Sequence, residues 1–116
     1  MKHETNGVYG EYAFFCAVNP IIPITWDRHQ TLPLGAADFE TWIDTKCVMH
    51  KHYQIHVQST HHPEWAYFLV NGYAFPWMLM DGWLWGYDLK PNVYADRPYH
   101  HPTDFMLELA RRKTFG

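Results

Sequence analysis

The sequence predicts a single α+β domain, with a helix near each end and a mixed or antiparallel central sheet of about four to six strands between them. Two observations lead to this prediction. Helix signals occur near both ends of the chain, whereas strand and turn signals fill the middle. The length of 116 residues suits one domain and leaves little room for a second, so residues 1–116 are taken as one unit.

Helices are predicted at residues 6–18 and 104–113. Thr5 or Asn6 can cap the first helix, and Asn19-Pro20 ends it, because the residue before a proline avoids the helical conformation. Thr103 is expected to cap the second helix, which carries acids early and basic residues late, as the helix dipole favours. Cys16 lies in an apolar helical run, where a free cysteine behaves as a small hydrophobic residue.

Strand patterns lie between the two helices. Residues 53–59 alternate between apolar and polar, which is the period of a half-buried strand. Residues 65–70 are continuously apolar, as in a central strand. Residues 21–26 form a short apolar run, which Pro23 would confine to the edge of a sheet.

Two dipeptides predict hairpin turns. Asn71-Gly72 follows the central apolar run, and Asp81-Gly82 separates the apolar runs at residues 75–80 and 83–87. Both dipeptides suit two-residue turns whose central residues have positive φ. Residues 90–102 contain three prolines and are expected to be irregular.

The composition describes a compact protein with few charges. Six Trp, eight Tyr and seven Phe supply the core. The formal net charge of −3 excludes a strongly basic nucleic-acid-binding protein, so DNA binding would rely on a local patch or on metal ions. The two cysteines form no disulfide framework, and neither a signal peptide nor an apolar run of membrane-spanning length is apparent. We therefore expect a cytoplasmic protein, in a bacterium or a phage-infected host cell.

Acidic residues and a lysine form the candidate site. If residues 44–46 belong to a strand, Asp44 and Lys46 share one face, because side chains two apart point the same way. Asp38 can return to the same edge through a tight bend at Glu40–Thr41. Two carboxylates and an ammonium group then converge, and such carboxylates can bind Mg²⁺ or Mn²⁺ while leaving water sites open.

Glu11 adds a third acid from the first helix. It precedes an uncharged run at residues 12–18, and a carboxylate there is costly to bury unless it is paired or binds a cation. We expect it to point along the sheet toward Asp38. The predicted metal ligands are thus Glu11, Asp38 and Asp44, with Asp38, Asp44 and Lys46 as catalytic residues.

This pattern resembles the PD-(D/E)XK nuclease superfamily, in which a helical glutamate precedes an aspartate and then an acid-x-Lys strand. The segments that carry the resemblance are Gly10-Glu11-Tyr12-Ala13, Gly35-Ala36-Ala37-Asp38 and Asp44-Thr45-Lys46. With residues 65–72 and 82–86, which are similar to small phage-borne relatives, it covers roughly residues 7–90. The resemblance implies a restriction-endonuclease-like fold and Mg²⁺-dependent cleavage of DNA phosphodiester bonds at the sheet edge. The short gap between the aspartates and the strand-like segment after Lys46 depart from the usual pattern.

Other functions remain open from the sequence. The chain can instead be a non-enzymatic interaction protein, such as a phage inhibitor or accessory factor, on a degenerate nuclease-like fold. The nine histidines offer a second metal hypothesis, since His50 and His52 would share one strand face. A functional nuclease of this size is expected to form a homodimer on duplex DNA.

Overall fold

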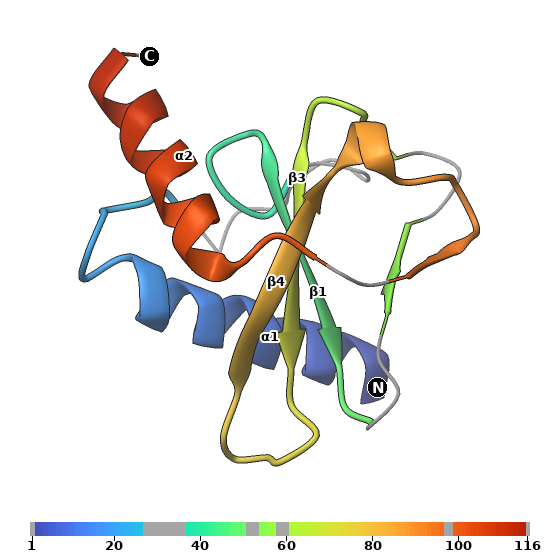
Figure 1. The fold of residues 1–116 in the computed structure, drawn as a ribbon. Coiled ribbons are helices and arrows are strands. Elements are labelled where there is room, and N and C mark those ends of the chain that lie inside the picture. Colours follow the sequence, from blue (N-terminus) through green and yellow to red (C-terminus); the bar gives the residue numbers. More distant parts are fainter. Residues whose placement is uncertain (1, 27–36, 51–53, 58–60, 97–98, 116) are drawn as a thin grey trace.

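The computed structural model describes residues 2–26, 37–50, 54–57, 61–96 and 99–115, with the side chains of residues 2–6 and 115 excepted. Two helices lie near the ends of the chain and strands lie between them, so the predicted α+β class is confirmed (Figure 1). In chain order the elements are α1 (Lys2–Val18), β1 (Ile43–Val48), β2 (Ile55–His56), β3 (Ala66–Asn71), β4 (Leu79–Trp85), the 3-10 helix η1 (Gly86–Asp88), β5 (Tyr94–Ala95) and α2 (Pro102–Phe115).

The described strands form one sheet of three strands and one of two. In the larger sheet the order is β1-β3-β4, with β1 parallel and β4 antiparallel to β3. All six residues of β3 are buried, which confirms the predicted central strand. The smaller sheet pairs β2 with β5 in antiparallel fashion. The central sheet is thus mixed, as predicted, but smaller than the four to six strands expected.

The second predicted hairpin turn is wrong, because Asp81-Gly82 lies inside β4. Leu69 pairs with Gly82 and Val70 pairs with Met80, so Asp81 is an extra residue in a β-bulge. A Cβ atom on Gly82 would lie 2.9 Å from the carbonyl oxygen of His100. The glycine therefore allows another part of the chain to approach the strand closely, and it does not form a turn.

The first predicted hairpin turn is also longer than two residues. Asn71 ends β3, and its side-chain oxygen accepts a hydrogen bond from the backbone N–H of Tyr73 at 2.7 Å. This local contact starts an Asx-type turn in place of the tight two-residue turn. Residues 72–78 then connect β3 to β4 and extend past α1 at the lower end of the sheet in Figure 1.

Two apolar clusters hold the sheet. On one face, α1 and α2 supply Phe14 and Phe105, whose rings lie 5.0 and 5.2 Å from that of Phe68 in β3. On the other face, Leu69 of β3 packs in a cluster with Ile55 of β2. The central strand is therefore covered on both sides, which explains its uninterrupted apolar sequence.

Helix α1 packs closely on β1. An added Cβ atom on Gly10 would lie 2.5 Å from the Cβ atom of Cys47, so this helix position requires glycine. The helix ends at Val18, as predicted, and the side chain of Asn19 accepts the N–H of Ile24 at 3.0 Å. Residues 21–26 do not form the predicted edge strand, and Cys16 is exposed instead of packed.

Helix α2 covers the predicted range but starts earlier. It begins at Pro102, and the imidazole of His101 accepts the backbone N–H of Thr103 at 3.1 Å. His101 therefore caps the helix in the role predicted for Thr103. Neither α1 nor α2 has the length and apolar character needed to cross a membrane.

Candidate active site

The turn that carries Asp38 has the geometry expected from the sequence. Phe39 and Ile43 exchange two backbone hydrogen bonds of 3.0 Å each across it. Glu40 and Thr41 occupy its tip with φ values of 54° and 65°. The backbone N–H of Trp42 also donates to the carbonyl oxygen of Phe39 at 3.2 Å, and the positive φ values of the two residues between them reverse the chain over a few residues. The tight bend predicted at Glu40–Thr41 is confirmed, and it places Asp38 beside β1.

Two side chains of helix α2 contact this turn. Lys113 forms an ion pair with Glu40, and the guanidinium group of Arg112 lies 3.9 Å from the ring centroid of Trp42. The same guanidinium group lies 5.3 Å from the ring centroid of Trp85 in β4. These contacts join the last helix to the segment that leads into β1.

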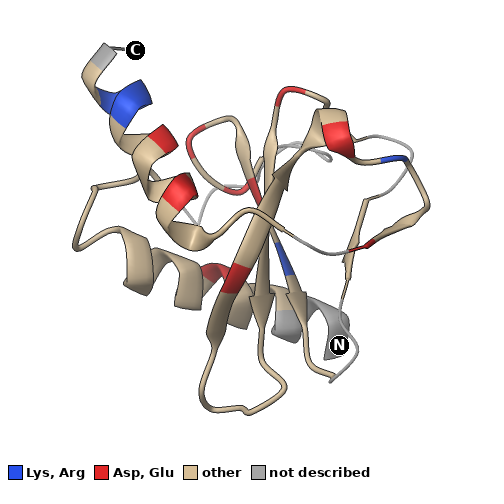
Figure 2. Ribbon diagram, viewed as in Figure 1, with Lys and Arg blue, Asp and Glu red and all other residues tan. Residues whose placement is uncertain are grey.

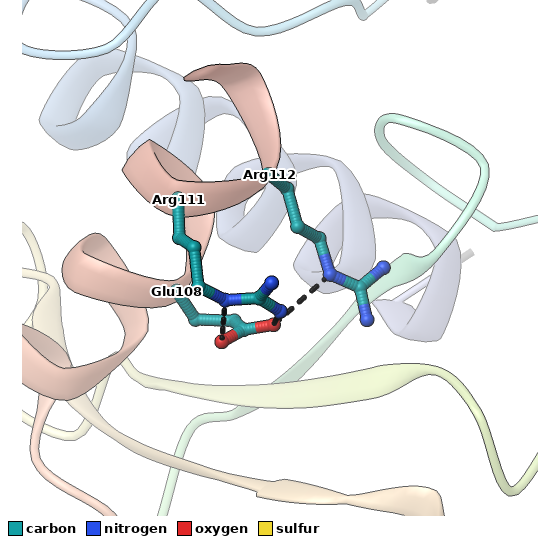
Figure 3. A network of polar contacts seen from close by, with 3 residues as sticks. All are labelled: Glu108, Arg111 and Arg112. Carbon is teal, nitrogen blue, oxygen red and sulfur yellow. Dashed lines mark hydrogen bonds and ion pairs between the residues drawn. The ribbon is translucent and has the colours of Figure 1, made fainter. Parts of the chain in front are cut away.

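A polar network on α2 orients Arg112 (Figure 3). The carboxylate of Glu108 accepts hydrogen bonds from Arg111 at 2.5 and 3.2 Å, and from Arg112 Nε at 3.1 Å. Hydrogen bonding to Arg111, and then to Arg112, keeps the pKa of Glu108 below its ordinary value. With its Nε bonded in this way, Arg112 directs the rest of its guanidinium group over Trp42.

Asp38 lies at the free edge of the sheet. Its Oδ2 atom accepts hydrogen bonds from both the backbone N–H and the hydroxyl group of Thr45, each at 2.9 Å. Because β1 is an edge strand, this N–H is directed away from β3 and is available to the carboxylate. Thr45 was not among the predicted site residues, since strand alternation turns its side chain away from Asp44.

The three predicted acids, Glu11, Asp38 and Asp44, are close enough to interact electrostatically. Burial, followed by the charges of Asp44 and Glu11 and a hydrogen bond with Asp44, raises the pKa of Asp38 to about 8. The backbone N–H of Thr45 opposes this shift without cancelling it. Asp38 therefore holds a proton at neutral pH, because burial first, and the neighbouring acids second, disfavour its charged form.

Asp44 and Lys46 share one face of β1, as predicted, and form an ion pair there. The Nζ atom of Lys46 lies 2.9 Å from Oδ2 of Asp44, and 5.8 Å from the ring centroid of Tyr67 on β3. The lysine thus neutralises one acid of the cluster. Strand alternation predicted the shared face, and this part of the prediction is confirmed.

Glu11 reaches the cluster from α1. Its Oε1 atom accepts a hydrogen bond from the indole N–H of Trp26 at 3.3 Å. Trp26 was not predicted to belong to the site, because fifteen residues separate it from Glu11 and no local pattern joins them. This hydrogen bond holds the Glu11 carboxylate at a position from which its charge raises the pKa of Asp38.

The acids suit a divalent cation in kind and in charge, since Mg²⁺ and Mn²⁺ prefer carboxylate oxygens. As the side chains stand, however, no group of three or more His, Cys, Asp or Glu residues within the described ranges is arranged to hold a metal ion. Asp44 bonds to Lys46, and Glu11 bonds to Trp26. Joint coordination by the three acids would require these side chains to reorient.

The histidine hypothesis gains no support from the described residues. His52 lies outside them, and His50 is an exposed residue after β1. Two other histidines have structural roles, with His62 stacked 3.8 Å from the ring of Trp65 and His101 capping α2.

Searches with the sequence and the structure found no matching protein-family model, no matching curated protein and no matching solved structure.

Proposed function

We propose that the chain is a metal-dependent nuclease that hydrolyses DNA phosphodiester bonds, of the PD-(D/E)XK type and with a reduced restriction-endonuclease-like fold. The observation that carries the proposal is the raised pKa of Asp38, which results from burial and, after it, from the nearby charges of Asp44 on β1 and Glu11 on α1. An acid cluster of this kind is unfavourable by itself and is relieved by a cation. Strongly perturbed acids that gather at one place are typical of functional sites.

Glu11, Asp38 and Asp44 would hold the ion. A bound Mg²⁺ or Mn²⁺ ion lowers the pKa of a coordinated water and stabilises negative charge on a phosphate oxygen. Asp38 would release its proton to solvent on binding, because the cation replaces that proton as the neutralising charge. Thr45 would keep Asp38 at the sheet edge through its two hydrogen bonds.

Lys46 would act on the substrate. Its ammonium group lies beside Asp44 and projects from an edge strand, with the ring of Tyr67 next to it. A positive charge at this position favours the transition state, in which negative charge grows on the phosphate. When the phosphate is bound, Lys46 would exchange its contact with Asp44 for one with the substrate.

Metal binding is tested by thermal unfolding in chelator, Mg²⁺ and Mn²⁺. A ligand that binds the folded state raises the melting temperature. We expect this rise for the wild-type protein and for the control Asp88→Asn, which changes an exposed acid in η1, and no rise for Asp44→Asn. Equal shifts for both variants would show that the ion binds elsewhere.

Activity is tested on duplex, nicked, branched and single-stranded DNA. The wild-type protein should cleave at least one of these substrates with Mg²⁺ or Mn²⁺ and stop on addition of chelator. Lys46→Met should lower the rate by about 100-fold or more while metal binding persists, because the lysine acts on transition-state charge. Lys90→Met, which changes an exposed lysine outside the site, should leave the rate unchanged. A folded wild-type protein that cleaves none of these substrates would refute the proposal.

A non-enzymatic interaction protein is the second candidate, and one observation favours it. Several large aromatic side chains are exposed near the turn that connects β3 to β4. Exposed apolar patches of this kind commonly mark binding surfaces. Failure of every cleavage assay, with the fold intact, would favour this candidate.

A further inference from the structure

Exposed aromatic and other large apolar residues lie on α1 and along the connection from β3 to the start of β4, and we call them the aromatic surface. The rings of Tyr9 and Phe75 lie 5.5 Å apart and join the two parts. The exposed large apolar residues of this surface are Val8, Tyr9, Tyr12, Tyr73, Phe75, Trp77 and Leu79.

The aromatic surface is nearly free of charge. Residues 72–80 contain no charged residue, and residues 7–12 contain only Glu11. The carboxylate of Glu11 bonds to the indole of Trp26. Figure 2 shows the connection from β3 to β4 without a basic or acidic residue. A nucleic acid would find no Lys or Arg in these segments to contact its phosphates, and such contacts supply most of its non-specific affinity. The chemistry of the surface instead suits an apolar protein partner.

The size of the surface suits a dimer interface. Its five aromatic side chains are about half exposed or more, which corresponds to about 400–700 Å² of accessible area. The largest apolar patch of a typical monomer reaches about 300–600 Å². Two copies placed face to face, with the rim that surrounds them, would bury on the order of 1,200 Å², which is the lower bound for a specific interface.

We propose that the aromatic surface docks a second copy of this chain as a two-fold symmetric homodimer. Two-fold contacts bring the same patch of both subunits together. A patch that is nearly free of charge therefore meets little like-charge repulsion from its copy. Trp77 is the candidate hot spot of this interface, because tryptophan is among the residue types that most often dominate the energy of interfaces. The proposal does not depend on nuclease activity.

Sedimentation velocity tests the proposal over protein concentrations from about 1 to 100 μM. The wild-type protein should shift from monomer to dimer within this range. Trp77→Ser should raise the dissociation constant by about tenfold or more, because it removes a candidate hot spot. The control is Tyr87→Ser in η1, outside the aromatic surface, since Tyr87 is 74% exposed and Trp77 is 75% exposed. Both variants should keep the wild-type circular dichroism spectrum and melting temperature of the monomer.

Two further measurements distinguish a second copy of the chain from a nucleic acid as the partner that binds the aromatic surface. Trp77→Asp should be monomeric throughout, because the two-fold contact brings like charges together. The same samples are titrated with a single-stranded oligonucleotide while tryptophan fluorescence is followed. A wild-type protein that stays monomeric, or a Tyr87→Ser variant that dissociates as readily as Trp77→Ser, would overturn the proposal. Oligonucleotide binding that requires Trp77 in a monomeric protein would assign the surface to nucleic acid instead.

Discussion

Replacement of Asp38 by asparagine should remove a pH dependence of stability that the folded protein owes to this one side chain. In the folded protein Asp38 keeps its proton up to about pH 8, whereas an ordinary aspartate loses it near pH 3.8. Between these values the folded state binds more protons than the unfolded state. The free energy of unfolding therefore falls as the pH rises, and the contribution of Asp38 is lost as the pH passes through the folded pKa.

The magnitude follows from the width of this interval. A difference of one pKa unit corresponds to about 1.4 kcal/mol, so the interval from 3.8 to about 8 sets an upper limit of about 6 kcal/mol. Asparagine reproduces the protonated acid, because its oxygen can accept both bonds from Thr45 and its amide can donate to Asp44. The variant should exceed the wild-type stability by only about 2 kcal/mol at pH 5 and by several kcal/mol more at pH 9.

Urea unfolding in chelator, followed by far-ultraviolet circular dichroism at pH 5 to 9, measures this difference. Asp96→Asn changes an exposed acid that bonds to Gln54 and should keep the wild-type pH dependence. Equal slopes for the wild-type protein and Asp38→Asn would refute the reasoning, since they would mean that folding does not raise the pKa of Asp38. Mg²⁺ should stabilise the wild-type protein most above pH 8, where no proton competes for Asp38.

Three other substitutions test the packing that positions the site. Gly10→Ala should cost about 1–3 kcal/mol in urea unfolding, because the new methyl group would collide with Cys47, whereas Gly7→Ala has open space and should gain about 1 kcal/mol of helix propensity. Thr41→Gly should raise the free energy of unfolding by about 1 kcal/mol, because glycine adopts the positive φ without strain, and Thr41→Ala should bring no such gain. Phe68→Ala should lower it by about 3–5 kcal/mol, since this ring is buried between both helices, and a loss below 1 kcal/mol would contradict the assigned core.

Local signals predicted those parts of the structure that local contacts determine. Asn19-Pro20 ends α1, and the reversal at Glu40–Thr41 brings Asp38 to β1, because each depends on a few adjacent residues. The face that Asp44 shares with Lys46 follows in the same way from strand alternation.

Distant contacts account for the failures. Asp81-Gly82 has the composition of a tight turn but lies inside β4. The glycine is needed there because the backbone of His100 lies close beside the strand. The bond from Trp26 to Glu11 spans fifteen positions, and no periodic pattern marks it. The hydrogen bonds that Thr45 donates to Asp38 require β1 to lie at the edge of the sheet. The order of the strands, which no local pattern predicts, places it there.

The contacts between α2 and the turn that precedes β1 have a consequence for the order of synthesis. Glu11 and Asp44 leave the ribosome before Arg112 and Lys113, which contact Trp42 and Glu40. A nascent chain therefore contains all three acids before the support that fixes their turn exists. The turn that carries Asp38 therefore gains its contacts with α2 only after α2 itself has left the ribosome.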